Sequence, residues 1–308
     1  MDQRRLGNNG PKVSAICFGA WPIGGGLGLV DKKIAIHTIH SALSEGITFF
    51  DTAEGYQTSE AVLGEALIGK RQSTILASKF SGTDHSESHI FSAIDKSLNA
   101  LKTDYIDLYQ VHTPQDKWPI EYTIASLNKL IDMGKVRHIG VSNFSQKQTA
   151  EAISFGSVQS SQPRYNLLFH KEEDANIKYC NENGIGVMAH SVLAKGLLTG
   201  KFKPGHKFND DDERRFFNFF KGDVFLSITS VLDTLSDWCR SRNKTLTELA
   251  VAWVLAKPGI STAIVGLKTS IQVKEVISAA NWRLTKDEMK DIDLITNHLE
   301  IKWVKDIH

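Results

Sequence analysis

The chain has little net charge, few cysteines and no long apolar run, and each scarcity excludes a class of protein. Its 308 residues include 36 Lys and Arg against 35 Asp and Glu, so a formal net charge of +1 creates no overall field that attracts nucleic acid or a membrane surface. No segment approaches the roughly 18 consecutive apolar residues of a membrane span, and the N-terminus lacks the apolar core of a secretory signal. We therefore expect a soluble, cytoplasmic protein with neither nucleic acid nor a membrane as a partner.

The cysteines are odd in number and widely spaced, at Cys17, Cys180 and Cys239. They predict reduced structural thiols, because a disulfide framework or a zinc site needs paired or clustered cysteines. None of the three has the sequence context of a reactive thiol. Disulfide, zinc and cysteine-based chemistry are all disfavoured.

Short apolar runs rich in Val, Ile and Phe alternate with segments of helical periodicity, a pattern typical of α/β proteins. No composition break, repeat boundary or flexible linker divides the chain. We predict one domain over residues 1–308, a (β/α)8 TIM barrel, and a doubly wound sheet is the alternative architecture. The eight predicted strands are SAICFGA (14–20), ITFFDTA (47–53), TILASKF (74–80), DYIDLYQVH (104–112), HIGVSNF (138–144), VQSSQ (158–162), GVMAHSV (186–192) and TAIVGLK (262–268).

Several flanking segments carry their own signals. The polar, turn-rich residues 4–14 predict a short hairpin that closes the bottom of the barrel. Thr/Ser caps followed by acidic residues predict helices that begin near residues 58 and 285. Residues 198–223, after the seventh strand, are far too many for an ordinary βα loop, so we expect this segment to lie over the C-terminal face.

Polar side chains stand where the predicted strands end, and in a barrel the carboxyl ends of all strands meet at one face. Tyr56 follows the end of the second strand on the next loop. These residues would ring one mouth of the barrel, and none of them is a nucleophile in a recognisable motif. At the strand ends stand Asp51, Lys79, His112, Ser142, Asn143 and Gln162.

The types of these residues suit protonation of an oxygen on which negative charge develops. A phenol with a pKa of about 10 is a weak acid, and an ammonium such as Lys79 would lower that pKa. Asp51 would keep the lysine charged, and His112 would either bond a substrate oxygen or share in a proton relay. Each side chain alone is also consistent with a purely structural role, as a helix cap, a solvated loop residue or an aromatic side chain on the surface. Their convergence on neighbouring strand ends favours function.

At this point the chain resembles the aldo-keto reductase superfamily over nearly its whole length. The motifs FGAWPIGG, FFDTAEGY, GKVRHIGVSNF, KGLLTGKF and AIVGLKTSIQV carry the resemblance, and the first is closest to a bacterial branch of YhdN-like and inositol-operon-type reductases. The resemblance implies a catalytic tetrad of Asp51, Tyr56, Lys79 and His112. In it Tyr56 is the general acid, Lys79 and Asp51 tune it, and His112 orients the substrate carbonyl.

The resemblance also implies NADPH as the cofactor, bound across the barrel mouth without a Rossmann fold. The glycines of GGGLG (24–28) lack the GxGxxG spacing and predict a substrate-side loop instead. Lys268 is the best candidate for the 2'-phosphate, and because a lysine is a less specific partner than a bidentate arginine, NADH use stays open. The implied cofactor residues are Gly19, Trp21, Ser142, Asn143, Gln162, Ser191, Leu193, Gly196, Lys201, Arg214, Gly266, Lys268, Gln272 and Glu275.

Three positions depart from the branch: His190 replaces an aromatic residue, Val192 replaces a proline and Val276 replaces an asparagine. Loss of the proline is expected to loosen its loop, and loss of the asparagine to remove a hydrogen bond near the adenine. Trp21 would wall the substrate pocket, with Trp118 and the tail 299–308 as further apolar surface. The phenylalanines of RRFFNFF (214–220) predict either a lid or, preferably, a helix packed on the barrel.

We predict an NADPH-dependent reductase of small aldehydes and ketones, and the alternative is a non-catalytic cofactor sensor or regulatory subunit. The resemblance to potassium-channel β subunits allows the second, but those subunits tend to replace the histidine that is intact here as His112. A metal-dependent hydrolase is disfavoured, because the strand ends show no clustered His and Asp ligands, and no metal site is predicted. A monomer is the default oligomeric state.

Overall fold

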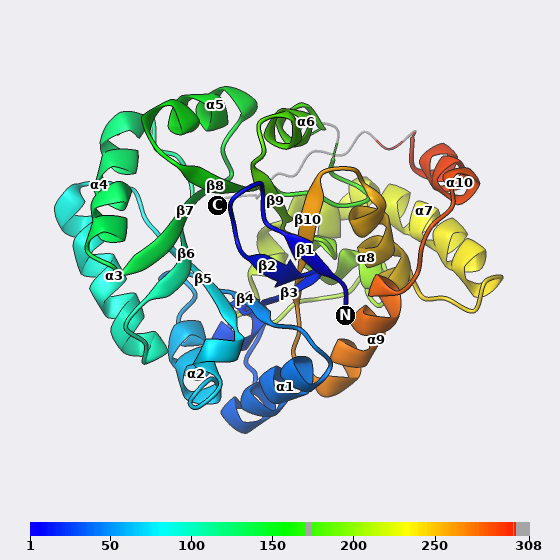
Figure 1. Cartoon of the computed structure of the whole chain (residues 1–308). Coiled ribbons are helices and arrows are strands. Elements are labelled where there is room, and N and C mark those ends of the chain that lie inside the picture. Colours follow the sequence, from blue (N-terminus) through cyan, green and yellow to red (C-terminus); the bar gives the residue numbers. More distant parts are fainter. Residues whose placement is uncertain (171–173, 298, 300–308) are drawn as a thin grey trace.

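A closed barrel of parallel strands forms the centre of the protein (Figure 1). The structure is a computed structural model, and it describes residues 1–170, 174–297 and 299. The strands follow one another around the barrel in chain order, and β10 closes it by pairing with β3. This closure confirms the predicted (β/α)8 fold over the doubly wound alternative. The strands are β3 (Ile16–Gly19), β4 (Phe49–Asp51), β5 (Ile75–Phe80), β6 (Ile106–Val111), β7 (Val136–Ser142), β8 (Val158–Gln162), β9 (Gly186–Ala189) and β10 (Ile260–Gly266).

Helices surround the barrel and alternate with its strands (Figure 1). Two of them, α7 and α8, lie between β9 and β10. This connection therefore has one helix more than the single helix that follows each strand in a regular (β/α)8 barrel. Among the described residues, no helix has the length and apolar character needed to cross a membrane. The helices are α1 (Lys32–Ser44), α2 (Ser59–Ala66), α3 (Glu87–Leu101), α4 (Ile120–Asp132), α5 (Gln146–Phe155), α6 (Asp174–Glu182), α7 (Gly222–Arg240), α8 (Leu246–Ala256), α9 (Ser270–Ala280) and α10 (Lys286–Thr296).

The two predicted helix caps have different outcomes. Thr285 forms a complete capping box with Glu288 at the start of α10, as predicted. Thr58 stands before α2, but its side chain makes no cap hydrogen bond, because its backbone is already helical with φ −87° and ψ −1°. The prediction of a side-chain cap at Thr58 was therefore wrong.

The N-terminal hairpin closes the bottom of the barrel, at the amino ends of the strands, as predicted. β1 (Gln3–Arg5) pairs antiparallel with β2 (Lys12–Ser14). The Gln159 side chain, near the start of β8, donates to the Leu6 carbonyl oxygen at 2.9 Å, and the Asn8 amide donates to the carbonyl of Gly184, just before β9, at 2.8 Å. These bonds hold the hairpin against the amino ends of the strands.

The barrel interior changes from apolar to polar along its axis. The part near the amino ends of the strands is a cluster that joins hairpin and strand residues, in which each large aliphatic or aromatic side chain contributes about 1.5–3 kcal/mol when fully buried. Among the described residues these apolar layers fill that end, and the cavity opens at the carboxyl end of the barrel. The cluster contains Leu6, Val13, Cys17, Phe49, Ala77, Leu108, Met188 and Ile264.

Two connections cross the open end. The loop after β3 begins with the 3-10 helix η1 (Trp21–Gly24), and at Leu27 it pairs with Asp212 of the long segment. This long segment lies over the C-terminal face, as predicted; it begins at the end of η3 (Ala194–Thr199) and contains η4 (Glu213–Phe216) and η5 (Asn218–Phe220). Gly26 allows the tight loop, because a Cβ there would come within 2.0 Å of the Trp21 ring.

Three of the four phenylalanines in RRFFNFF (214–220) pack in the core, and one of these also reaches the cavity. Two short 3-10 helices, η4 and η5, stand where the sequence predicted one packed helix. Phe217, Phe219 and Phe220 are buried in the main core, and Phe217 also lines the cavity. The preferred interpretation of packing is therefore right for these three rings, and the lid interpretation stays a prediction.

Candidate active site

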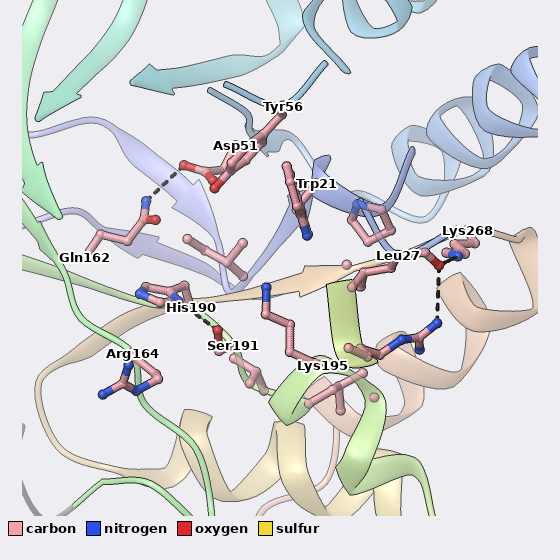
Figure 2. A pocket seen from close by; sticks show the side chains of 18 of the residues that line it. Trp21, Leu27, Asp51, Tyr56, Gln162, Arg164, His190, Ser191, Lys195 and Lys268 are labelled. Carbon is pink, nitrogen blue, oxygen red and sulfur yellow. Dashed lines mark hydrogen bonds between the residues drawn. The ribbon is translucent and has the colours of Figure 1, made fainter. Parts of the chain in front are cut away.

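A cavity of about 460 Å³ opens at the carboxyl end of the barrel (Figure 2). Its volume is in the range of sites that bind a cofactor or small molecule. The structure brings to its lining every residue of the predicted cofactor set except Glu275, together with Asp51, Tyr56 and His112. Glu275 instead accepts a hydrogen bond from the Thr245 hydroxyl at the start of α8, at 2.8 Å.

Lys79 and Asp51 form an ion pair behind the cavity wall. The Lys79 Nζ lies 2.6 Å from Asp51 Oδ1, and the two side chains are 0% and 4% exposed. The second carboxylate oxygen accepts from the amide nitrogens of Gln162 at 2.9 Å and Gln110 at 3.4 Å, so the buried charge is fully bonded. Burial lowers the pKa of Lys79, but Asp51 and Tyr56 outweigh this effect and raise it above the ordinary value, so the ammonium stays charged.

Tyr56 presents its hydroxyl to two nitrogen atoms. Lys79 Nζ and His112 Nε2 both lie 3.4 Å from the phenol oxygen, and the Trp21 ring packs edge-on against the Tyr56 ring at 4.7 Å. Burial raises the pKa of Tyr56 above its ordinary value, and this effect exceeds the lowering by the Lys79 charge. The Lys79 charge acts in the predicted direction, but burial outweighs it, because the sequence reveals the neighbouring cation and not the depth of burial.

His112 is neutral in this environment. Burial, followed by the charges of Lys79 and Lys195, lowers the pKa of His112 to about 3. Its Nδ1 lies 2.8 Å from the hydroxyl oxygen of Ser81, a residue that sequence reasoning missed. The sequence feature that could have identified Ser81 is its position two residues after Lys79, on the loop that leaves β5.

The polar residues at the ends of β7 and β8 are bonded to one another. Ser142 Oγ donates to the Gln162 carbonyl at 3.1 Å, and Asn143 Nδ2 donates to the His112 carbonyl at 2.9 Å. Both amide hydrogens of Gln162 have partners in Asp51 and Gln110, so its Oε1 is the atom left to accept a bond from a ligand amide.

His190 extends this network, and like Ser81 it is a residue that the sequence did not assign to the site. Its Nε2 lies 3.0 Å from Asn143 Oδ1, and its Nδ1 lies 2.9 Å from the Ser191 hydroxyl (Figure 2). Burial and the nearby Arg164 and Lys79 charges lower the pKa of His190 well below its ordinary value. The sequence marked this position only as a departure from an aromatic residue.

Three cations gather at the far end of the cavity. Burial and the Arg214 guanidinium lower the pKa of both Lys201 and Lys268. Asp212 pairs with Arg214, and Lys268 Nζ donates to the Leu27 carbonyl oxygen at 2.5 Å (Figure 2). Asp212 offsets part of the effect of Arg214 on both lysines, and a bound phosphate would add further negative charge to this group of cations.

Lys195 rises into the cavity from the side opposite Trp21 (Figure 2). Its Nζ lies 2.5 Å from Glu213 Oε1, and the Trp21 indole donates to the same oxygen at 3.2 Å. Ser191, Ala194 and Lys195 all have positive φ, at about 1–3 kcal/mol of strain each, so the segment is held in an unusual shape. The sequence does not reveal this contact, because Lys195 and Glu213 lie 18 residues apart.

The remaining expectations concern positions around the site. Val192 and Val276 are both buried and apolar, at 1% exposure.

Trp118 donates its indole N–H to the Thr83 carbonyl oxygen at 3.0 Å and is not part of the cavity lining. In the predicted tail, Leu299 packs on the main core, and residues 300–308 lie outside the described residues. In the part of the chain that the structure describes, no group of three His, Cys, Asp or Glu side chains is placed to hold a metal ion.

Comparisons with known proteins identify the family of this chain. The model of the aldo/keto reductase family matches residues 15–297. The chain is 36% identical to the aldo-keto reductase YhdN of Bacillus subtilis, over 96% of this chain and 93% of that protein. It is 32% identical to a probable voltage-gated potassium channel subunit beta of Arabidopsis thaliana, over 91% and 92%. A solved glycerol dehydrogenase of Gluconobacter oxydans superposes with a TM-score of 0.86 at 31% identity, covering 98% of this chain and 99% of the other. The chain therefore belongs to the aldo/keto reductase family and is an NAD(P)H-dependent oxidoreductase.

Proposed function

We propose that the protein reduces small aldehydes or ketones to alcohols with NADPH, in a reversible hydride transfer. The observation that carries this proposal is the Tyr56 phenol oxygen, which lies 3.4 Å from both Lys79 Nζ and His112 Nε2 at the cavity wall. A protonated phenol held between two nitrogen donors suits donation of a proton to a carbonyl oxygen. Tyr56 is accordingly the general acid of the proposed reaction.

The residues around Tyr56 have distinct roles in this proposal. The nicotinamide cofactor supplies the hydride that the substrate carbon receives. As negative charge develops on the substrate oxygen, Tyr56 donates its proton, and the fixed positive charge of Lys79 stabilises the phenolate that remains. Asp51, bonded to Lys79 at 2.6 Å, keeps that ammonium charged and in place. The neutral His112 donates a hydrogen bond that orients the carbonyl.

The cation cluster supports NADPH over NADH. Lys201, Arg214 and Lys268 line one end of the cavity, and within the part of the chain that the structure describes Arg214 alone of the three has a direct carboxylate partner, Asp212. A 2'-phosphate adds about two negative charges at neutral pH, by analogy with other phosphate monoesters, so it suits this surplus better than a ribose hydroxyl does. Lysine provides a point charge without a fixed hydrogen-bond pattern, and for that reason the proposal allows residual binding of NADH.

A titration followed by turnover tests the proposal. Purified protein is titrated with NADPH and with NADH by fluorescence, and oxidation of each is then followed by absorbance with a panel of aldehydes and ketones. We expect tighter binding of NADPH and carbonyl-dependent oxidation. Binding without turnover on any carbonyl would instead support the alternative function of a sensor or regulatory subunit, which the similarity to a potassium channel subunit beta suggests.

The cellular compartment of the protein is also a proposal. All three cysteines are buried free thiols, which suits a reducing compartment, and we propose the cytoplasm. A single domain, a monomeric state and the absence of nucleic-acid and membrane partners stay predictions.

A further inference from the structure

Ser81 is anchored on several sides directly behind His112. Its backbone amide donates to Glu54 Oε2 at 3.1 Å, and its carbonyl oxygen lies 3.1 Å from His89 Nε2. Its hydroxyl oxygen accepts from the Gly55 amide at 3.3 Å and lies 2.8 Å from His112 Nδ1. The hydroxyl therefore has a fixed position relative to the imidazole.

The protons of this contact can be assigned by counting donors and acceptors. A serine hydroxyl has one hydrogen to donate, and its oxygen here already accepts from the Gly55 amide. Within the described residues, His112 Nδ1 is the acceptor that the Ser81 hydroxyl reaches. The Ser81 oxygen has a second lone pair, but if it accepted from Nδ1–H its own hydrogen would find no acceptor among the described residues. Donation from the Ser81 O–H to Nδ1 satisfies both groups, and it places the single proton of the neutral imidazole on Nε2.

This tautomer decides where the Tyr56 proton points. His112 Nε2–H and the Lys79 ammonium both donate toward the phenol oxygen, each at 3.4 Å. A phenol oxygen that accepts from two sides has its own O–H directed away from both donors. That direction leaves the proton available to a ligand in the cavity.

The opposite tautomer would disable the arrangement. With the proton on Nδ1, the His112 Nε2 would present a lone pair. It would accept the Tyr56 O–H, and it would repel the carbonyl oxygen of a substrate that it is meant to orient.

We propose that Ser81 is a positioning residue that holds His112 in its Nε2–H tautomer, so that both His112 and Tyr56 donate toward the substrate oxygen. This proposal rests on the proposed reductase function for its catalytic consequence, whereas the tautomer itself is a property of the free protein. The tautomer depends only on residues of this chain.

The tautomer is measured by ¹⁵N NMR of the histidine side chains in the free protein. The His112 signals are assigned by their loss in a His112→Gln variant. The wild-type protein should show a protonated Nε2 and an unprotonated Nδ1 at neutral pH. A protonated Nδ1 in the wild type would overturn the proposal, whatever the catalytic outcome.

Variants then separate positioning from general structural effects. Ser81→Ala removes the donor, and we expect a tautomer mixture together with a fall in kcat of about 10-fold, the loss of one hydrogen bond. NADPH affinity should stay unchanged. Ser81→Thr keeps the hydroxyl and should restore both the Nε2–H signal and most of kcat, and Ser73→Ala, an exposed serine before β5, is the matched control.

The outcomes of this design are distinguishable from failure of the proposed function. Unchanged His112 signals in Ser81→Ala would contradict the proposal. Equal activity of Ser81→Ala and the wild type would contradict it as well. If the wild type reduces no carbonyl, the reductase function fails, but the NMR comparison still decides whether Ser81 sets the tautomer.

Discussion

The Lys79 ammonium lies 2.6 Å from the Asp51 carboxylate, and the two side chains are almost completely buried. The carboxylate has further donors in Gln162 and Gln110, so both charges are satisfied without water. A pair of this kind is weak evidence for stability, but removal of one partner leaves a buried charge unpaired. The first prediction follows from this asymmetry.

Asp51→Asn is expected to destabilise the fold and to impair reduction together. The unpaired Lys79 loses the carboxylate that raises its pKa, and the free energy of unfolding should fall by about 3–5 kcal/mol. Urea unfolding of the purified variant measures this change. The control is Asp95→Asn, because Asp95 pairs with Lys135 at a side-chain exposure of 59% and should change stability by less than about 1 kcal/mol. Similar losses in the two variants would contradict a special role of the buried pair.

Tyr56→Phe is expected to abolish carbonyl reduction while it spares cofactor binding. The variant keeps the ring that packs against Trp21 but lacks the proton donor, so kcat should fall by at least about 10²–10⁴-fold. Fluorescence titration with NADPH should give an affinity close to that of the wild type. Tyr122→Phe, at an exposed tyrosine of α4, is the control and should have full activity. Equal loss of binding and turnover in Tyr56→Phe would remove Tyr56 from the role of acid.

The pH profile of the reaction should reflect Tyr56 and not a histidine. Burial raises the pKa of Tyr56 above its ordinary value, so the phenol is protonated at neutral pH, and the reduction rate should stay level around neutrality and fall only in the alkaline range in which the phenol loses its proton. Alcohol oxidation needs the phenolate as a base, and its rate should rise with pH over the same range. The pKa of His112 is about 3, so this residue stays neutral above pH 5. Steady-state rates in both directions test this, and an inflection near pH 6.5 would show that His112 titrates in the working range.

The sequence predicts the barrel and the tetrad because both depend on local order. Alternation of apolar runs and helical segments specifies the strands, and the parallel strands of a barrel place residues such as Asp51 and His112 at the same end. Gln110 was detectable as well, because it lies two residues before His112 and side chains two apart share one face of a strand.

Other features depend on contacts between distant loops, and the sequence does not reveal them. Lys195 meets Glu213 only because the long segment folds back across the cavity mouth. The raised pKa of Tyr56 reflects burial depth, which a residue's neighbours in the sequence do not encode. Thr58 has the pattern of a helix cap, yet its backbone is helical, and the neighbouring Ser59 bonds to the Thr52 hydroxyl at 2.6 Å instead.

Lys268→Ala is expected to weaken NADPH binding far more than NADH binding. In the free protein Lys268 Nζ donates to the Leu27 carbonyl at 2.5 Å, and it shares one end of the cavity with Arg214 and Lys201. A charge-assisted bond to a phosphate contributes about 1.5–3 kcal/mol, so the NADPH dissociation constant should rise roughly 10- to 100-fold.

The ratio of the two dissociation constants separates recognition of the phosphate from a structural effect. If Lys268 acts mainly by holding Leu27 in place, its loss should weaken both cofactors equally, because they share every group except the 2'-phosphate. Lys274→Ala, at an exposed lysine of helix α9, which begins just after Lys268, should change neither constant. A selective loss of NADPH therefore assigns the 2'-phosphate to Lys268, whereas an unchanged ratio assigns Lys268 to the loop and leaves Arg214 and Lys201 to recognise the phosphate.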